Sequence, residues 1–350
     1  MEKVRIGFVG VGYMGQVAHL RNYATLDDCE VVAIAELRRS LGKKVGTRYG
    51  VAKVYVNHEE MLKEEELDGI VAVQEFRRHG LMLPELAKAG IPIFHEKPLA
   101  STVETGRRIV EAVEGAGTWQ MAGYHKRSDP ATMYAKAEVE RLKETGELGA
   151  MKYVRVFIAR GDWVANGATD LLKADEPPAK LEEDPPPKDM DEPTYREFMN
   201  FNVYFCHQID LLRHLLGESY AVKYADPSGV VFGAESESGI PGVIEMAPYS
   251  MSVGWEESAL VCFERGYVKV ELPAPLAMNR AGRVEILRDL GKESTPEKIV
   301  PQLPTVHAMR QQAMNFLAAI RGKMKPMCDG REALECLERV REYFRLWKGV

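Results

Sequence analysis

The sequence predicts two domains: an α/β domain with a doubly wound parallel sheet over residues 1–123, and an α+β domain with an open, largely antiparallel sheet over residues 124–350. The length of 350 residues is more than twice the roughly 150 residues expected of one domain. In the first part short apolar runs alternate with helical patterns, which is typical of a parallel sheet. Later apolar runs follow one another without helices between them, which indicates antiparallel pairing. Whether the final helices pack back on the first domain is left open.

The strands predicted for the first domain are the apolar runs at 4–9, 31–35, 54–56, 70–73, 91–94 and 119–122. A helix is predicted over 13–23, because Met14, Val17, Ala18 and Leu20 recur at helical spacing.

The second domain opens with a predicted helix (130–144) and a long strand (151–159). The stretch 173–193 is rich in proline and acid, so it is predicted to be a long irregular excursion, and a flap is one interpretation of it. A hairpin is predicted around Glu264-Arg265-Gly266. The remaining predictions are helices over 204–216, 306–320 and 333–347, and strands over 230–234, 243–246, 259–264, 267–272 and 284–287.

Composition narrows the possible partners. The net charge of −6 gives no basic surface for nucleic acid or anionic lipid, and no apolar run reaches the ~18 residues of a membrane span. The five cysteines are scattered without a C-x-x-C pair, and the histidines lack metal-ligand spacing. The N-terminus has no signal-peptide pattern. We expect a cytoplasmic protein that acts on a small molecule and binds no nucleic acid, membrane or metal.

A glycine motif follows the first predicted strand. Gly10-Val11-Gly12-Tyr13-Met14-Gly15 is a G-x-G-x-x-G run that opens a helix, which is the context expected of a dinucleotide site. Gly10 permits a tight turn, Gly12 admits a pyrophosphate, and Gly15 allows close packing of helix and strand. Glu36, about twenty residues further on, ends a strand where an acid can bind ribose hydroxyls. A glycine turn with a surface glutamate is the alternative.

The choice of cofactor depends on the residues after the second strand. Glu36 would repel the 2′-phosphate of NADP, which favours NAD. Arg38 and Arg39 could offset that charge or stack on adenine, so NADP remains possible.

The run GIPIFHEKPLA places ionisable groups at the end of the fifth predicted strand. The carboxyl ends of strands in a doubly wound sheet face the ligand crevice, so His95, Glu96 and Lys97 are expected beside the cofactor. Pro98 fixes the backbone immediately after the lysine. A solvated turn would explain the same residues without function.

Five segments together resemble one family, the glucose–fructose oxidoreductase/inositol dehydrogenase/MocA (Gfo/Idh/MocA) oxidoreductases. They are GFVGVGYMG, HEKPLA, GYHKRSDP, HQIDLLRHLLGE and DGREALECLERVREYF, and they extend over nearly the whole chain. The resemblance implies a nicotinamide-dependent oxidoreductase acting on sugars, cyclitols or their derivatives. It maps the family's EKP lysine to Lys97 and its helix histidine to His207, and it implies a cis peptide before Pro98.

The chemistry of these two side chains suits alcohol oxidation. A neutral His207 can take the hydroxyl proton, because imidazole titrates near neutral pH. A Lys97 ammonium group can stabilise the developing alkoxide. A packed histidine and a solvated lysine are the alternatives.

The chain departs from the family pattern at two places. The family's Asp, four residues before the helix histidine, is Val203 here, so Tyr204 could supply a hydroxyl instead, or simply pack, with Asn200 two turns back. Where the family has a Thr-Pro-Asn-like turn, this chain has Gln74-Glu75-Phe76-Arg77-Arg78-His79, in which His79 is expected mainly to build the turn.

The predicted site residues fall into three groups. The catalytic candidates are Lys97, His207 and Tyr204. The cofactor-binding candidates are Gly10, Gly12, Tyr13, Met14, Gly15, Glu36, Arg38, Gln74, His79, Glu96 and Lys97. The substrate candidates are His125, Arg127, Asp162, Trp163, Asn200 and Asp210, for several of which a structural role is the alternative.

The predicted function is hydride transfer between NAD(P) and a secondary alcohol or ketone of a sugar, glycoside, cyclitol or derivative. Two alternatives remain open: an NAD-recycling glycosidase or lyase, and a cofactor-binding regulator without catalytic activity. The outer face of the second sheet is a plausible association surface, so a homodimer or homotetramer is expected.

Overall fold

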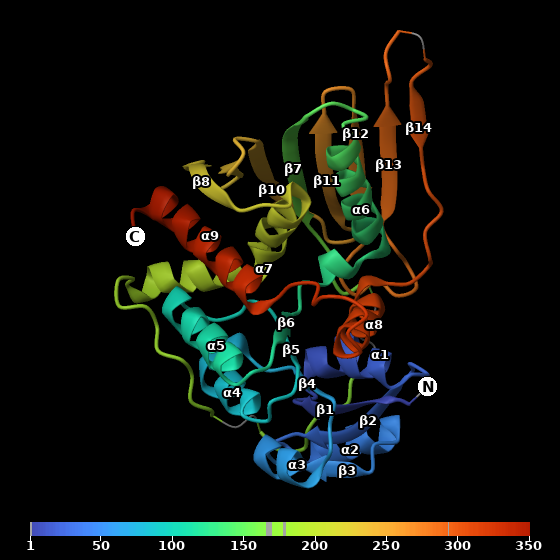
Figure 1. Cartoon of the computed structure of the whole chain (residues 1–350). Helices are drawn as coiled ribbons and strands as arrows, with labels where there is room; N and C mark the ends of the chain where they lie inside the picture. The colour runs from blue at the N-terminus through green and yellow to red at the C-terminus, as the bar shows by residue number, and fades with distance from the viewer. Residues whose placement is uncertain (1, 166–169, 178–179, 293) are drawn as a thin grey trace. The chain divides into compact units, whose positions relative to one another are not determined.

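The structure is a computed structural model that describes residues 2–165, 170–177, 180–292 and 294–350 (Figure 1). The chain divides into two compact units, and neither is continuous in sequence. Unit 1 comprises Met1–Tyr124, Gly167–Met199 and Gln312–Leu337, and unit 2 comprises His125–Asn166, Asn200–Gln311 and Glu338–Val350.

Unit 1 contains a six-stranded sheet in which every neighbouring pair is parallel. Its order, β3-β2-β1-β4-β5-β6, is that of the doubly wound dinucleotide-binding fold, so the predicted Rossmann domain is confirmed. The strand order reverses between β1 and β4, and ligands of such sheets bind beyond the carboxyl ends of the strands there. The strands are β1 (Val4–Val9), β2 (Cys29–Ala35), β3 (Lys53–Tyr55), β4 (Gly69–Ala72), β5 (Ile93–His95) and β6 (Gln120–Ala122).

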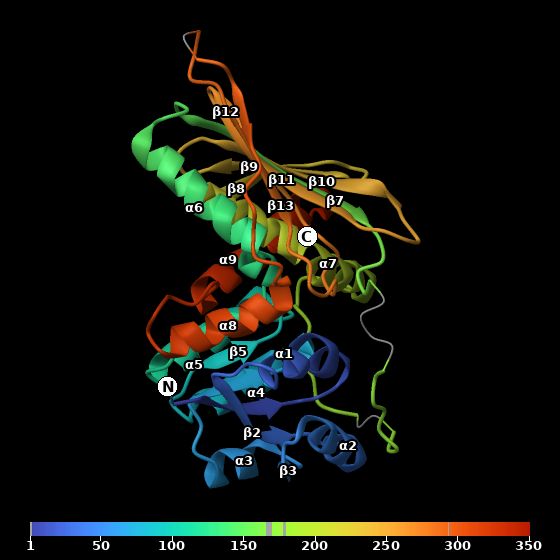
Figure 2. The ribbon, with the colours of Figure 1, turned by 90° about the vertical axis from the view of Figure 1, so that its right-hand side faces the viewer.

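Helices cover both faces of this sheet, which explains why β4 is buried at every position (Figure 2). A side chain on Gly7 would touch Met61 of α3, whereas one on Gly69 would touch Phe316 of α8 on the opposite face. The helices are α2 (Arg39–Tyr49), α3 (His58–Glu64), the 3₁₀ turn η2 (Phe76–Arg78), α4 (His79–Ala87) and α5 (Val103–Gly115), together with the unit 1 part of α8 (Ala308–Ile320) and of α9 (Gly330–Lys348).

The helix predicted after the glycine motif is not a regular α-helix. The helix predicted over 13–23 is present: residues 13 and 14 are already helical, η1 (Gly15–Leu20) is a π-helix, and α1 (Arg21–Tyr23) completes it. All six residues of η1 are buried, so no single apolar face fixes its period. Such widened turns are rare and are often found at functional sites.

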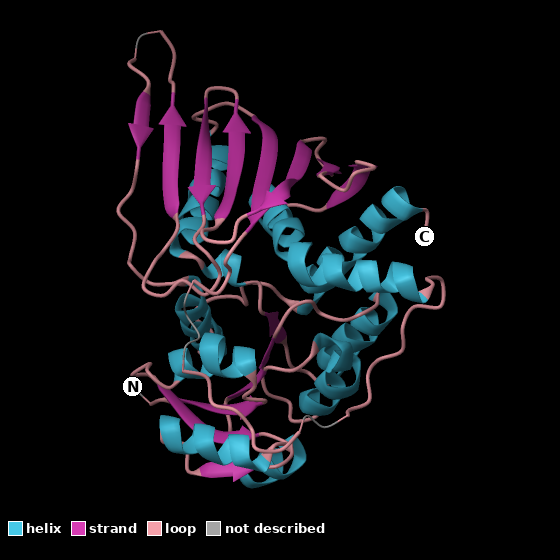
Figure 3. Ribbon diagram, turned by 180° about the vertical axis from the view of Figure 1, so that it is seen from behind, coloured by secondary structure: helices cyan, strands magenta, loops and turns pink. Residues whose placement is uncertain are grey.

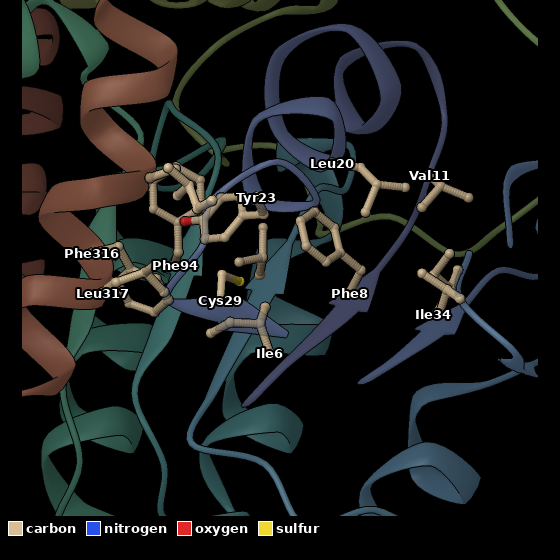
Figure 4. Packing of buried hydrophobic residues seen from close by; sticks show 14 of the residues in the cluster. Ile6, Phe8, Val11, Leu20, Tyr23, Cys29, Ile34, Phe94, Phe316 and Leu317 are labelled. Atoms are coloured by element: carbon tan, nitrogen blue, oxygen red, sulfur yellow. The ribbon is translucent and has the colours of Figure 1, made fainter. Parts of the chain in front are cut away.

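Aromatic rings fill the core of unit 1 beside β1 and β5 (Figure 4). Phe316 of α8 is fully buried, and its ring centroid lies 5.8 Å from that of Phe94 and 5.7 Å from that of Trp119. Phe8 and Tyr23 meet edge to face at 5.3 Å. These edge contacts add to the free energy gained by removing the rings from water.

Unit 2 contains an eight-stranded sheet of order β14-β13-β12-β11-β7-β10-β9-β8. Every pair is antiparallel except β7 with β10, so the predicted open, largely antiparallel sheet is confirmed. The strands are β7 (Met151–Arg160), β8 (Tyr220–Ala225), β9 (Val231–Ser236), β10 (Pro241–Ser250), β11 (Glu256–Phe263), β12 (Gly266–Glu271), β13 (Arg283–Arg288) and β14 (Glu297–Ile299).

Helix α6 (Pro130–Thr145) lies along one face of this sheet, and in the described part of the chain no helix covers the other face (Figure 3). The residues at its two ends explain where the helix begins and stops. Asp129 caps the N-terminus by accepting the Ala131 N–H at 2.8 Å, and Gly146 ends the helix in a left-handed conformation. Burial raises the pKa of Asp129 to about 6.

Helix α7 (Glu192–Leu216) is longer than predicted, since it begins at Glu192 rather than at Tyr204. Asp191 accepts the N–H of Thr194 at 2.9 Å, and Pro193 stands in the first turn, where its missing N–H is no loss. The irregular stretch predicted over 173–193 is therefore correct for its described residues only as far as Asp191.

The strand predictions for unit 2 missed two elements, the edge strands β8 and β14. The predicted hairpin is present, with Phe263 paired to Gly266 across a two-residue turn. Within the described residues no helix is both long and apolar enough to span a membrane. None of the five cysteines forms a disulfide.

Replacing Phe316 with alanine should test the core of unit 1. We expect Phe316→Ala to lower the free energy of unfolding by about 3–5 kcal/mol, because the buried ring leaves a cavity between two aromatic neighbours. Urea unfolding followed by circular dichroism measures the change. Met314→Ala on the same helix is the control, since that side chain is 39% exposed. Equal losses from both variants would contradict this account of the core.

Candidate functional site

The glycine motif of unit 1 forms a turn that only glycine fits. Gly10 has a φ of +89°, and a Cβ there would lie 2.4 Å from Gln74 Nε2 and 2.5 Å from the Val73 carbonyl oxygen. A Cβ on Gly15 would lie 2.7 Å from the carbonyl oxygen of Gly10. The turn thus presents bare backbone at the start of a helix, where N–H groups favour a phosphate. Gln74, a predicted cofactor residue after the end of β4, lies directly against Gly10 of this turn.

Glu36 is buried at the end of β2 and reaches back to this turn. Its Oε2 accepts the N–H of Val11 at 3.0 Å, so the carboxylate borders the glycine loop, as an acid that binds ribose hydroxyls must. Arg38 holds the same carboxylate in a fork, with Nε 2.7 Å from Oε1 and Nη2 3.1 Å from Oε2. The residues present therefore fit a dinucleotide.

Two other predicted cofactor residues border the glycine loop. Tyr13, 37% exposed, and the half-buried Met14 are the first helical residues, between Gly12 and η1.

Lys97 follows β5, the neighbour of β4, and a buried network fixes its backbone. The N–H of Lys97 donates to Glu96 Oε2 at 3.1 Å, while Glu96 Oε1 lies 2.5 Å from Nε2 of His19, on η1. Although burial opposes ionisation, the bonds to His19 and Lys97 lower the pKa of Glu96. The peptide between Lys97 and Pro98 is cis, as the resemblance implied.

Two more histidines lie buried next to this network. His79 Nδ1 bonds the Leu99 carbonyl oxygen at 3.0 Å, and its ring centroid lies 5.4 Å from that of His95. Burial lowers the pKa of His79 to about 3 and that of His95 to about 4, so both are neutral near neutral pH. These contacts fit the turn-building role expected of His79; its contact with a cofactor stays a prediction.

In unit 2, α7 presents His207 to His125, with ring centroids 4.7 Å apart at 75°. Both side chains are buried. Arg127 and Asp210, two predicted substrate residues, form a fully buried fork with Nη2 2.7 Å from Oδ1 and Nε 2.9 Å from Oδ2. The alternative of a structural role fits this pair better than contact with substrate.

A buried ion pair lies beside these histidines in sequence. Lys126 pairs with Glu257 of β11, and Glu257 also accepts Gln208 Nε2 at 2.6 Å and Trp255 Nε1 at 3.1 Å. The neighbours of both histidines, Lys126 and Gln208, are thus joined through one carboxylate. This fixes the backbone that carries the imidazoles.

The end of β7 carries the remaining substrate candidates. Asp162 Oδ1 accepts the N–H groups of Val164 and Ala165, both at 3.1 Å, so this carboxylate closes its own turn. Trp163 is 38% exposed and Asn200 is exposed. Both remain candidates.

Comparison with known proteins agrees with this geometry. Residues 4–124 match the model of an oxidoreductase family with an NAD-binding Rossmann fold, GFO_IDH_MocA. A myo-inositol 2-dehydrogenase of Thermotoga maritima is 25% identical over 70% of this chain and 63% of its own length. An inositol 2-dehydrogenase of Burkholderia cenocepacia is 25% identical over 89% of this chain and 87% of its own. Residues 4–124 thus match the Gfo/Idh/MocA oxidoreductase model, and similarity to the inositol dehydrogenases extends over most of the chain.

A solved structure shares the fold. An aldose–aldose oxidoreductase of Caulobacter crescentus superposes with a TM-score of 0.71 at 18% identity, covering 99% of this chain and 98% of that one. The Thermotoga alignment spans less than two thirds of that relative's length. The family match confirms NAD as the predicted cofactor of the domain that holds Gly10 and Glu36, and the roles of these two residues stay predictions.

At the position of the missing family Asp, Val203 is 38% exposed. Tyr204 is half-buried, and Arg160, at the end of β7, holds its guanidinium 5.1 Å from the centre of the Tyr204 ring. Burial raises the pKa of Tyr204, although Arg160 opposes the rise. A catalytic role for Tyr204 stays a prediction.

Four residues that hold these centres are absent from the predicted site residues: His19, Lys126, Glu257 and Arg160. One signal was available for Glu257, because it alternates in β11 with the buried Ala259, Val261 and Phe263, which marks a charge on the inner face. For His19 no signal existed, because its bond to Glu96 joins residues 77 positions apart.

The two buried histidines predict an acid-sensitive unit 1. Above pH 6.5 they are neutral both folded and unfolded; below it the unfolded imidazoles take up protons while the folded ones do not. Each should therefore cost about 1.4 kcal/mol of unfolding free energy per pH unit as the pH falls from 6.5 toward 4. Urea unfolding at several pH values measures the slope. His79→Asn should make it shallower; an unchanged slope would show that folded His79 already binds a proton.

The ion pair of unit 2 predicts a large effect of one neutral substitution. Glu257→Gln should lower the free energy of unfolding by about 3–5 kcal/mol, because it leaves the Lys126 ammonium buried without its carboxylate. Lys126→Met in the same chain should recover most of the loss. Glu256→Gln, at the exposed neighbouring position, is the control. Thermal or urea unfolding measures the free energies. Equal losses from Glu257→Gln and Glu256→Gln would refute the buried ion pair.

Proposed function

We propose that the chain is an NAD-dependent dehydrogenase or reductase that acts on a secondary alcohol or ketone of a sugar, glycoside, cyclitol or derivative. The observation that carries this proposal is the position of Lys97 at the end of β5, two strands from the glycine turn of β1 in the same sheet. Relatives named inositol 2-dehydrogenase support a polyhydroxylated substrate.

Bound NAD would supply the acceptor for the hydride that leaves the alcohol carbon. His207 is proposed to take the hydroxyl proton, since a neutral imidazole is a suitable base near neutral pH. Lys97 is proposed to stabilise the developing negative charge on the oxygen. Glu96 accepts the N–H of Lys97, so a buried carboxylate fixes the backbone that carries the ammonium group.

The substrate residues and the assembly are also proposals. His125, Trp163 and Asn200 are proposed to contact substrate hydroxyls, with Tyr204 assisting proton transfer. The uncovered face of the unit 2 sheet is proposed to join copies of the chain into a homodimer or homotetramer, and the cytoplasm is proposed as the compartment.

Nicotinamide reduction with a panel of sugars, glycosides, sugar acids and inositols tests the function. We expect Lys97→Met to lower kcat by a factor of about 10² or more while binding of NAD changes little, because the ammonium group acts in the transition state. Lys88→Met, a surface lysine paired with Glu85, is the control. His207→Asn should lower kcat in a similar way.

Two outcomes would change the assignment. Full activity of Lys97→Met would remove this lysine from catalysis. Cleavage of a glycoside without net formation of NADH would replace the dehydrogenase with the NAD-recycling glycosidase.

A further inference from the structure

An acidic segment from the middle of the chain lies against the nucleotide-binding elements of unit 1. Leu172 and the Gln16 side chain exchange two hydrogen bonds, from Leu172 N–H to Gln16 Oε1 at 3.0 Å and from Gln16 Nε2 to the Leu172 carbonyl at 3.2 Å. Gln16 directly follows the last glycine of the motif and also bonds the Val11 carbonyl at 2.9 Å. The segment is therefore anchored beside the glycine turn.

Four residues later the same segment reaches the first turn of α2. Glu176 Oε1 accepts the N–H of Ser40 at 2.8 Å, and Glu176 Oε2 accepts the Ser40 hydroxyl. Asp175 donates its N–H to Ser40 Oγ at 2.8 Å and holds Lys44 Nζ 2.6 Å from its Oδ1. Two carboxylates are thus fixed where α2 begins.

The turn between β2 and α2 is the place where the chain can distinguish NAD from NADP. The adenosine ribose belongs beside Glu36, and the 2′-phosphate of NADP would extend toward the residues that follow β2. A helix N-terminus, a serine hydroxyl and basic side chains are the groups that usually bind such a phosphate. The chain has these donors in Arg38, Ser40 and Lys44, but each is bonded to a carboxylate: Glu36, Glu176 and Asp175 respectively.

Glu36 alone is a weak barrier to the phosphate, because the Arg38 fork compensates its charge. In Rossmann domains that bind NADP, an arginine near this position binds the 2′-phosphate. Exclusion of NADP therefore needs a second acid. Glu176 opposes the phosphate in two ways. It accepts the N–H and the hydroxyl of Ser40, so neither donor is available, and its negative charge repels the phosphate.

We propose that Glu176 is a specificity-determining residue that excludes the 2′-phosphate of NADP from the turn between β2 and α2. The proposal rests on the proposed function in one respect, that the chain binds a nicotinamide dinucleotide at Glu36. It adds that selectivity is set by a residue 140 positions from Glu36, delivered by the acidic segment.

The test compares two nucleotides that differ only in the 2′-phosphate, 5′-AMP and adenosine 2′,5′-bisphosphate. Their dissociation constants are measured by calorimetry at fixed ionic strength for the whole chain and for Glu176→Gln and Glu176→Ala. We expect both variants to bind the bisphosphate about tenfold or more tightly than wild type does, with binding of 5′-AMP changed by less than about threefold. Alanine should have the larger effect, because it also frees Ser40.

Glu182→Gln is the matched control. It removes one charge from the same segment, at a residue whose backbone carbonyl, and not its side chain, accepts Arg78 Nε. If it raises bisphosphate affinity as much as Glu176→Gln, general charge is responsible and the proposal is overturned. Unchanged selectivity in both Glu176 variants, with 5′-AMP still bound, overturns the proposal but leaves the dehydrogenase standing. Absence of binding by either nucleotide overturns both.

Discussion

The close backbone approach at the glycine turn is the constraint on which unit 1 depends. Gly10 abuts Gln74 and the Val73 carbonyl, and Gly15 abuts Gly10, so a side chain at either glycine would force β1, η1 and β4 apart. That approach brings the Val11 N–H within reach of Glu36, which joins the turn to β2. The same small set of contacts thus packs the core of unit 1 and shapes the turn at the carboxyl end of β1.

Both units organise their polar centres around a buried carboxylate. Glu96 connects His19 to the backbone of Lys97, and Glu257 connects Lys126 to Gln208 and Trp255. A buried acid is unfavourable unless it is fully hydrogen-bonded, and in return it tolerates few alternative geometries. The reactive candidates Lys97 and His207 are each adjacent in sequence to such a centre. Their backbones are therefore held in place by these carboxylates and the groups bonded to them.

Local chemistry explains which features were predictable. The glycine turn, Glu36 and the strand before Lys97 follow from spacing within one βαβ unit, and the hairpin follows from its own turn. The start of α7 at Glu192 was missed because the surrounding prolines and acids resemble a loop, although Asp191 and Pro193 supply a capping signal. Contacts such as Lys126 with Glu257 could not be predicted, since only the folded sheet brings positions 131 apart together.

The open sheet of unit 2 has two edges, and their chemistry limits how copies can associate. Edge strand β14 is three residues long and carries Glu297 and Lys298, while the other edge, β8, has its Val222 N–H capped by Glu342 at 3.2 Å. Short, charged or capped edges are poor templates for a further strand. Strand addition would extend without limit into fibres, whereas contact between faces can close as a symmetric pair. The short, charged and capped edges of this sheet therefore protect the protein from polymerising by strand addition.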